Sequence, residues 1–315
     1  MKIISSITIK LRWFVIVLVC LPATAQAQGD VARWTVEVAQ HYRFVPDLTY
    51  LIADGYELKL DVIGPRDVSK PLPTLLHFHG SGWIRGNKAE SLLHFLSYLE
   101  MGFAIVNVGY RLAPVALAPA AVEDCRCALL WLIRNAKEYG FDTDRIVADG
   151  FSTGGHLALT TGMLPVSAGF DRRCATSDFE GEKPADLYEP QMSVAAIVNF
   201  FGVTDVADLI EGPNAKMYAV RWMGAKADWR DVAQRVSPIK YVRPDLPPIL
   251  TIHGDSDLLV PYQHAVRLHK ALDKAGVPNK LHTISRGGHG GFTLDEDLKV
   301  AQVIRSFLHF HGVLR

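Results

Sequence analysis

The stretch Gly150-Phe151-Ser152-Thr153-Gly154-Gly155 decides how the rest of the chain is interpreted. It follows the apolar run 145–149, which predicts a buried strand, and precedes residues 156–161, which predict the start of a helix. A G-x-S-x-G pattern between a strand and a helix is typical of a nucleophile elbow, a turn that lifts a serine hydroxyl clear of the sheet. Side chains at Gly150 and Gly154 would collide across so tight a turn, so glycine is required at both positions. The alternative is an ordinary glycine-rich turn that carries a serine by chance.

The length and composition of the chain are typical of a globular protein. The 315 residues fit one large α/β domain, and 49% hydrophobic with 21% charged residues is a globular balance. Lysine plus arginine and aspartate plus glutamate both number 33, and no basic run is interleaved with aromatics, so we expect no nucleic-acid partner. The sequence has no CxxC pair and no HExxH motif, so we expect neither a metal nor another cofactor.

The N-terminus has the pattern of an export signal. Lys2, Lys10 and Arg12 precede the apolar run 13–21, and Ala25-Gln26-Ala27 is a small-x-small cleavage site. The alternative is a membrane anchor, but the run is shorter than the ~20 residues that a span needs. We therefore expect a signal peptide over residues 1–27, one catalytic domain over 28–315, and a secreted or periplasmic protein without a stable membrane anchor.

The cysteines leave two interpretations open. Cys20 leaves with the signal, Cys125 and Cys127 lie in a helix-like stretch, and Cys174 lies in a polar loop. Export permits a bridge from Cys174 to either neighbour, which would leave one free thiol. The alternative is three unpaired buried cysteines.

Strands and helices alternate along most of the chain, which predicts a mostly parallel sheet with helices on both faces. Asp54-Gly55 between two alternating runs predicts an antiparallel hairpin at the N-terminal edge. Residues 205–238 have helical spacing and predict a helical insertion after the sixth strand, and the polar segment 165–190 predicts an exposed loop. Eight strands are expected, over 48–53, 57–63, 73–79, 103–108, 145–149, 194–200, 248–253 and 279–285. Helices are expected over 91–99, 119–137, 155–163, 262–275 and 294–310.

A nucleophilic Ser152 needs a histidine base and a carboxylate that orients it, in the chain order serine, acid, histidine. His289 follows the last predicted strand among four glycines, which suits a side chain presented into a site. Asp257 follows a strand and reaches further from its end than Asp255, which we expect to brace the loop. Asp205 is a third candidate acid. His156 lies one helical turn beyond the serine and makes a poor base.

An oxyanion hole needs backbone N–H groups aimed at the developing negative charge. One donor is expected from Thr153, the residue after the nucleophile, and others from the loop 77–86. Gly80 and Gly82 leave the amides of this loop unobstructed. Taken alone, the loop is better explained as an ordinary glycine-rich turn, but the elbow together with it favours an oxyanion hole.

Together these motifs resemble secreted carboxylesterases of the α/β-hydrolase superfamily. The resemblance runs from about Tyr50 to the C-terminus and is strongest to hormone-sensitive-lipase-like and BD-FAE-type esterases, which are related to acetylxylan and feruloyl esterases. It implies an α/β-hydrolase fold, a triad of Ser152, Asp257 and His289, and oxyanion donors at Ser81, Gly82 and Thr153. Two positions depart from the family pattern, because Ser81 replaces a glycine and Thr153 replaces an alanine.

Several residues have secondary roles in this interpretation. Trp83 and Phe151 are candidates for substrate binding, although Trp83 could instead pack between the loop and the core. The insertion residues Met217, Tyr218, Trp222 and Met223 form either a lid or a packed helical seam. Arg111, in the stretch 107–114, is expected to pair with Asp124 and to be structural.

The sequence thus predicts an exported serine carboxylesterase for short-chain esters, with acetyl or feruloyl esters of carbohydrates as candidate substrates. Prolyl-oligopeptidase-like peptidases and arylformamidases share the elbow and acid loop, but this chain lacks an oligopeptidase propeller. A non-catalytic binding module is a third alternative, and the retained serine and histidine argue against it.

Overall fold

The computed structural model describes residues 23–175 and 192–315, and it divides the chain into two compact units, 1–39 and 40–315. The described part of the first unit lies in the helix α1 (Ala23–His41), which extends to the start of the second. The predicted signal segment falls mostly outside the described residues, so export stays a prediction. Within the described residues, no helix has both the length and the apolarity that crossing a membrane requires.

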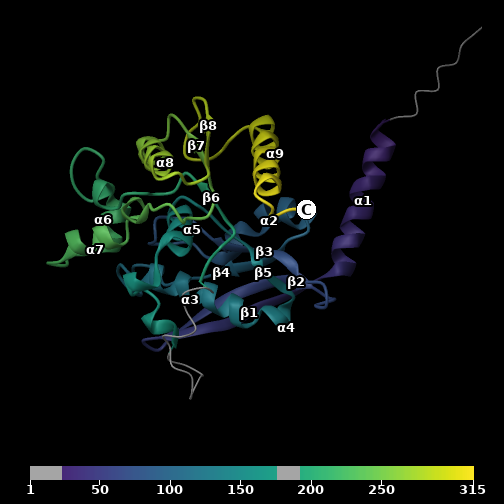
Figure 1. Cartoon of the computed structure of the whole chain (residues 1–315), viewed down its shortest axis with the longest axis horizontal. Helices are drawn as coiled ribbons and strands as arrows, with labels where there is room; N and C mark the ends of the chain where they lie inside the picture. Colours follow the sequence, from purple (N-terminus) through teal and green to yellow (C-terminus); the bar gives the residue numbers. More distant parts are fainter. Residues whose placement is uncertain (1–22, 176–191) are drawn as a thin grey trace, which may run out of the picture. The chain divides into compact units, whose positions relative to one another are not determined.

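The second unit is built on one eight-stranded sheet in the order β1-β2-β4-β3-β5-β6-β7-β8 (Figure 1). The β1–β2 and β2–β4 pairs are antiparallel, and every other neighbouring pair is parallel. The strands are β1 (Tyr42–Ala53), β2 (Tyr56–Pro65), β3 (Leu72–Phe78), β4 (Ala104–Val108), β5 (Phe141–Phe151), β6 (Ala196–Phe200), β7 (Ile249–Gly254) and β8 (Asn279–Ile284). The prediction of an α/β-hydrolase fold with a mostly parallel sheet is confirmed.

Local sequence explains both the edge and the centre of this sheet. The hairpin turns at Asp54 and Gly55, both with positive φ, as the dipeptide predicts, although β1 begins six residues earlier than expected. Every residue of β4, β6 and β7 is buried, so both faces of these strands are covered, as their continuous apolar runs indicate.

Helices α3 and α5 pack against each other and against the central strands. Helices α2 and α9 lie near each other, and an Arg305–Glu100 ion pair joins them (Figure 1). The helices of this unit are η1 (Lys88–His94), α2 (Phe95–Glu100), α3 (Ala120–Arg134), α4 (Ala136–Tyr139), α5 (Thr153–Met163), η2 (Val166–Ala168), η3 (Arg172–Ala175), η5 (Ala207–Leu209), α6 (Met217–Met223), α7 (Trp229–Arg235), η6 (Pro238–Tyr241), α8 (Gln263–Ala275) and α9 (Leu294–Phe310).

Two predicted elements differ in detail from the structure. The helix expected over 91–99 is a 3₁₀ turn followed by a short α-helix, and the Asn87 side chain caps it by accepting the Ala89 N–H at 2.9 Å. The insertion after the sixth strand is confirmed, and it consists of the short helices η5, α6, α7 and η6.

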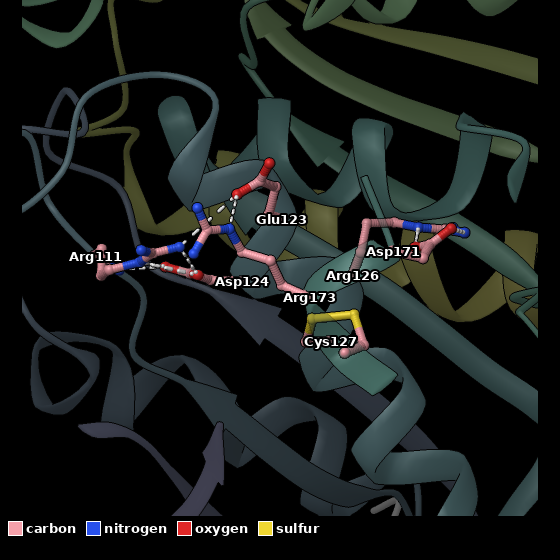
Figure 2. Close-up of a disulfide and its surroundings, with 8 residues drawn as sticks. Arg111, Glu123, Asp124, Arg126, Cys127, Asp171 and Arg173 are labelled. Carbon is pink, nitrogen blue, oxygen red and sulfur yellow. Dashed lines mark hydrogen bonds and ion pairs between the residues drawn. A yellow bond between two sulfur atoms is a disulfide. The ribbon is translucent and has the colours of Figure 1, made fainter. Parts of the chain in front are cut away.

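A disulfide and two arginines, Arg126 and Arg173, fasten the segment after α5 onto α3 (Figure 2). Cys174 pairs with Cys127, and Cys125 is free and buried, which resolves the choice left open by the sequence. Arg126 Nε donates to Asp171 Oδ1 at 2.6 Å beside the bridge. The described part of the segment 165–190 is therefore partly buried, and the prediction of an exposed loop is wrong there. Residues 176–191 lie outside the described residues.

The expected pairing of Arg111 is confirmed in the same region. Its Nη2 donates to Asp124 Oδ1 at 2.7 Å, and its backbone N–H donates to Asp124 Oδ2 at 2.9 Å (Figure 2). Both side chains are buried, so the pair joins the loop after β4 to α3 and serves the fold.

Candidate active site

The site forms where the central parallel strands end, since their carboxyl ends meet at one edge of the sheet. Ser152 stands between β5 and α5 with φ +56° and ψ −117°, a conformation that L-residues rarely adopt. A Cβ on Gly154 would lie 2.0 Å from Phe78 O, and one on Gly150 would lie 2.5 Å from the Gly154 carbonyl. The predicted steric requirement for both glycines is thus confirmed, and the turn is a nucleophile elbow in shape.

Asp257 and His289 meet at this edge from the loops after β7 and β8. His289 Nδ1 lies 2.7 Å from Asp257 Oδ2, while Asp257 Oδ1 accepts the N–H groups of Leu259 at 2.8 Å and Val260 at 3.0 Å. Burial alone would raise the pKa of the Asp257 carboxyl, but hydrogen bonds from His253 and His289 outweigh it and hold the pKa well below its usual range. The carboxylate is therefore ionised and fixed at both oxygens.

The other candidate acids and the other candidate base lie elsewhere. Asp255 Oδ1 accepts the Arg286 N–H at 2.6 Å and braces the loop, as expected. Asp205 faces Arg267 at 3.6 Å. His156 is fully buried, and its Nε2 lies 2.7 Å from the Val236 carbonyl. Burial lowers the pKa of His156 to about 4, so it is neutral and committed to the core.

Ser152 and His289 line one pocket of about 470 Å³. Its wall is mainly apolar and aromatic, and it includes Ile84, Phe151, Phe201, Tyr218 and Leu259. Among the described residues, no hydrogen bond joins Ser152 Oγ to His289, and this bond often tightens only when substrate binds. Ser152 and His289 thus face one space of small-substrate size, and Asp257 contacts His289 from behind the pocket wall.

The loop after β3 lies over the elbow with three successive residues in the left-handed region. Their φ values are +88° for Ser81, +74° for Gly82 and +59° for Trp83. The Gly82 N–H donates to Thr153 Oγ1 at 3.1 Å, so this expected oxyanion donor already has a partner. In the described chain no residue accepts the Ser81 N–H, and the Thr153 N–H belongs to the first turn of α5, where helical amides are unpaired.

Trp83 does not line the pocket, and the expectation that it contacts substrate is wrong. It is fully buried, stacks on Trp222 with ring centroids 4.1 Å apart, and meets His156 edge-on at 5.0 Å. Trp222 and Met223 are likewise buried, so this part of α6 is a packed seam. Tyr218 does line the pocket, and its hydroxyl donates to the Leu259 carbonyl at 3.0 Å. Phe151 lies in the pocket wall as expected.

Sequence reasoning missed Phe201, which directly follows β6. Its ring lines the pocket and lies 4.5 Å from the His289 ring. Its place at the carboxyl end of a parallel strand is the signal that could have identified it, because the elbow and the acid loop occupy the same position on β5 and β7.

A buried cluster behind the elbow was also missed. Asp149 accepts hydrogen bonds from His77 Nδ1 and His94 Nε2, both at 2.7 Å. Among the described residues, these three side chains are the group whose ligand atoms lie close enough together to hold a metal ion. Burial alone would raise the pKa of the Asp149 carboxyl, but the two histidines outweigh it and hold the pKa well below its usual range. Each carboxylate oxygen thus already has a donor, so hydrogen bonding accounts for the cluster without a metal.

Comparison with known families identifies this arrangement. The BD-FAE family model matches residues 60–272, which include the oxyanion loop, the elbow and the acid loop. The chain belongs to the BD-FAE family. His289 lies beyond the matched range, so its assignment depends on the geometry described above.

Several relatives of this BD-FAE protein are named as esterases. Esterase LipC of Mycobacterium tuberculosis is 28% identical over 232 residues, 72% of this chain and 55% of LipC. Esterase LipQ of the same organism is 25% identical over 266 residues, 82% of this chain and 60% of LipQ. The chain thus spans about half the length of the curated relatives it matches.

Solved structures of esterases have the same fold as this BD-FAE chain. A propionate-bound esterase 2 from Thermogutta terrifontis, a Planctomycetes species, has a TM-score of 0.68 at 25% identity, covering 88% of this chain and 97% of that one. The same esterase phosphonylated by cyclosarin has a TM-score of 0.68 at 25% identity, covering 85% and 94%. A truncated carbohydrate esterase from gut microbiota has a TM-score of 0.68 at 27% identity, covering 85% and 97%.

Proposed function

We propose that this protein is a serine carboxylesterase in which Ser152, His289 and Asp257 form the catalytic triad. The observation that carries the proposal is the 2.7 Å contact between His289 Nδ1 and an ionised Asp257, in the pocket that Ser152 lines. This contact sets the histidine tautomer, because Nδ1 carries the proton that the carboxylate accepts. His289 Nε2 is then left unprotonated and can act as a base.

Acylation follows from these roles. Ser152 Oγ forms a bond to the ester carbonyl carbon, His289 Nε2 takes the serine proton, and the carbonyl π electrons move to the oxygen. The amides of Ser81 and Thr153 stabilise this oxyanion. When the carbonyl reforms, the bond to the alcohol oxygen breaks, and His289 returns its proton to the departing alcohol. Water then repeats the same sequence on the acyl-enzyme and releases the acid.

The pocket supports a preference for short or compact acyl groups. Phe151 and Phe201 line a pocket of about 470 Å³. This volume is near the lower end of the range for ligand pockets. The relatives include an esterase seen with propionate and a carbohydrate esterase. Acetyl esters of carbohydrates and small aromatic acyl esters are therefore the substrates we propose to test first.

Hydrolysis of p-nitrophenyl esters from acetate to decanoate tests the proposal. We expect turnover of the short esters, and we expect Ser152→Ala to lower kcat by about 10⁴-fold or more. Ser91→Ala is the matched control, because Ser91 lines the same pocket and has no role in the mechanism. Paraoxon should add one diethyl phosphoryl group to the peptide that carries Ser152 and none to the Ser152→Ala variant.

Two further substrates decide the class of bond. Release of acetate from acetylated xylan supports a carbohydrate esterase, whereas faster cleavage of an aminoacyl-anilide than of any ester would favour the peptidase alternative. Full activity of Ser152→Ala, or no turnover of any ester by the wild-type protein, would contradict the mechanism.

We also propose that the protein is exported, with cleavage after Ala27. The pattern of residues 1–27 supports this, and so does the Cys127–Cys174 disulfide, because such bridges persist in oxidising compartments. Mass spectrometry of the protein from the periplasm or medium should find a mature N-terminus at Gln28. Recovery of the protein in the cytoplasm with residues 1–27 intact would refute export.

A further inference from the structure

The hydroxyl of Thr153 connects the elbow to the loop that covers it. Thr153 is fully buried at the start of α5, and its Oγ1 accepts the Gly82 N–H at 3.1 Å across 71 residues of sequence. The esterases that this chain resembles usually carry alanine at this position, and alanine offers no acceptor. The hydrogen bond is therefore one that the usual residue could not make.

The loop that donates this hydrogen bond needs support from its surroundings. Ser81, Gly82 and Trp83 all have positive φ, and two of the three are not glycine. Non-glycine residues are strained in this conformation and persist there only where the surroundings fix them. The partly buried hydrogen bond from Gly82, the middle residue of the three, is such a constraint.

The other end of the loop is held by Tyr110. The Tyr110 hydroxyl donates to the His79 carbonyl at 2.8 Å, and the Tyr110 and His79 rings stack with centroids 4.4 Å apart. The loop is thus fixed before Gly80 by Tyr110 and after Ser81 by Thr153. The Ser81 amide lies between these two anchors, and no described residue accepts its hydrogen.

We propose that Thr153 is a positioning residue whose hydroxyl holds the Gly82 amide and thereby aims the Ser81 amide at the oxyanion. This inference rests on the proposed esterase function. The oxyanion is then bound by the backbone N–H groups of Ser81 and Thr153, while the Gly82 N–H supports the loop. Thr153 contributes twice, with its amide to the reacting oxygen and with its side chain to the loop.

The test replaces the hydroxyl and keeps the shape. In Thr153→Val, we expect kcat for p-nitrophenyl acetate to fall by about 10- to 100-fold while KM changes less than about threefold, since misplaced amides weaken the transition state more than substrate binding. Thr153→Ser restores the acceptor and should recover most of kcat. Thr161→Val is the matched control, because Thr161 is buried on the same helix and its hydroxyl has no described partner.

An inhibitor pair separates positioning from simple loss of structure. A trifluoromethyl ketone forms an oxyanion on the enzyme, so its affinity should fall in Thr153→Val by the same factor as kcat/KM, whereas the affinity of the product acid should not change. Urea unfolding checks that the variant is folded. If Thr153→Val does not fold, Thr153→Ala removes the same acceptor with a smaller side chain and should show the same kinetic loss.

Three results would overturn the inference. They are wild-type kcat in Thr153→Val, equal losses in Thr153→Val and Thr153→Ser, or a higher kcat in Thr153→Ala. Each would leave the esterase function intact, because the wild-type enzyme would still hydrolyse the ester and Ser152→Ala would not. Failure of the wild-type protein to hydrolyse any ester would instead refute the proposed function itself.

Discussion

Asp257→Asn is expected to lower kcat for ester hydrolysis by about 10⁴-fold without unfolding the acid loop. Asp257 Oδ1 accepts two backbone N–H groups, and an asparagine would keep its single oxygen there. Its NH₂ group would then face His289 Nδ1 and donate to it. The histidine would be forced into the tautomer with the proton on Nε2, and it could no longer take the proton of Ser152.

The neighbouring aspartate provides the control for this experiment. Asp255 lies two residues away and accepts the Arg286 N–H, so Asp255→Asn tests the loop without touching the base. We expect Asp255→Asn to keep most of kcat. Steady-state kinetics on p-nitrophenyl acetate measures both variants, and equal losses would mean that the contact between Asp257 and His289 is not what orients the base.

Gly154→Ala is expected to disrupt the site and the fold together. The added Cβ would meet the carbonyl oxygens of Phe78 at 2.0 Å and His79 at 2.6 Å, which are backbone atoms that cannot rotate away. Either the elbow or the start of the oxyanion loop must then move. We expect the free energy of unfolding to fall by about 3 kcal/mol or more, the upper end of overpacking effects, and esterase activity to be lost.

Urea unfolding and the same ester assay measure this effect. Gly288→Ala is the matched control for stability, because a Cβ there has no neighbour within 4 Å and the backbone needs no positive φ. We expect it to unfold at nearly the wild-type urea concentration. Wild-type stability and activity in Gly154→Ala would show that the elbow is less tightly packed than the geometry described here.

The sequence predicted that Ser152, Asp257 and His289 lie close together because all three follow strand ends. Ser152 comes directly after β5, Asp257 and His289 lie in the loops that follow β7 and β8, and parallel strands end at one edge of the sheet, so the order of strands along the chain predicts that they meet. The same rule would have included Phe201. Local patterns sufficed wherever the feature depended on one strand and the turn that follows it.

Other features depended on contacts that no local pattern encodes. Cys125 and Cys127 are two residues apart on α3, about 200° around the helix, so the choice between them depends on how α3 is rotated against its neighbours. Trp83 is buried because the insertion brings Trp222 against it from 139 positions away in the sequence. The bond between Thr153 and Gly82 likewise required the structure.

The stacking of Trp83 on Trp222 limits which residues of α6 can change when substrate specificity evolves. On α6, Tyr218 lines the pocket while Trp222, one turn later, packs under the oxyanion loop. Met217 and Val220 on the same helix are exposed and can vary without disturbing this packing. Change in substrate range is therefore open at Tyr218, whose side chain lines the pocket, whereas substitution of Trp222 would disturb the proposed oxyanion loop through Trp83. A mutational library that fixes Trp222 and randomises Tyr218 would explore specificity while this packing is kept.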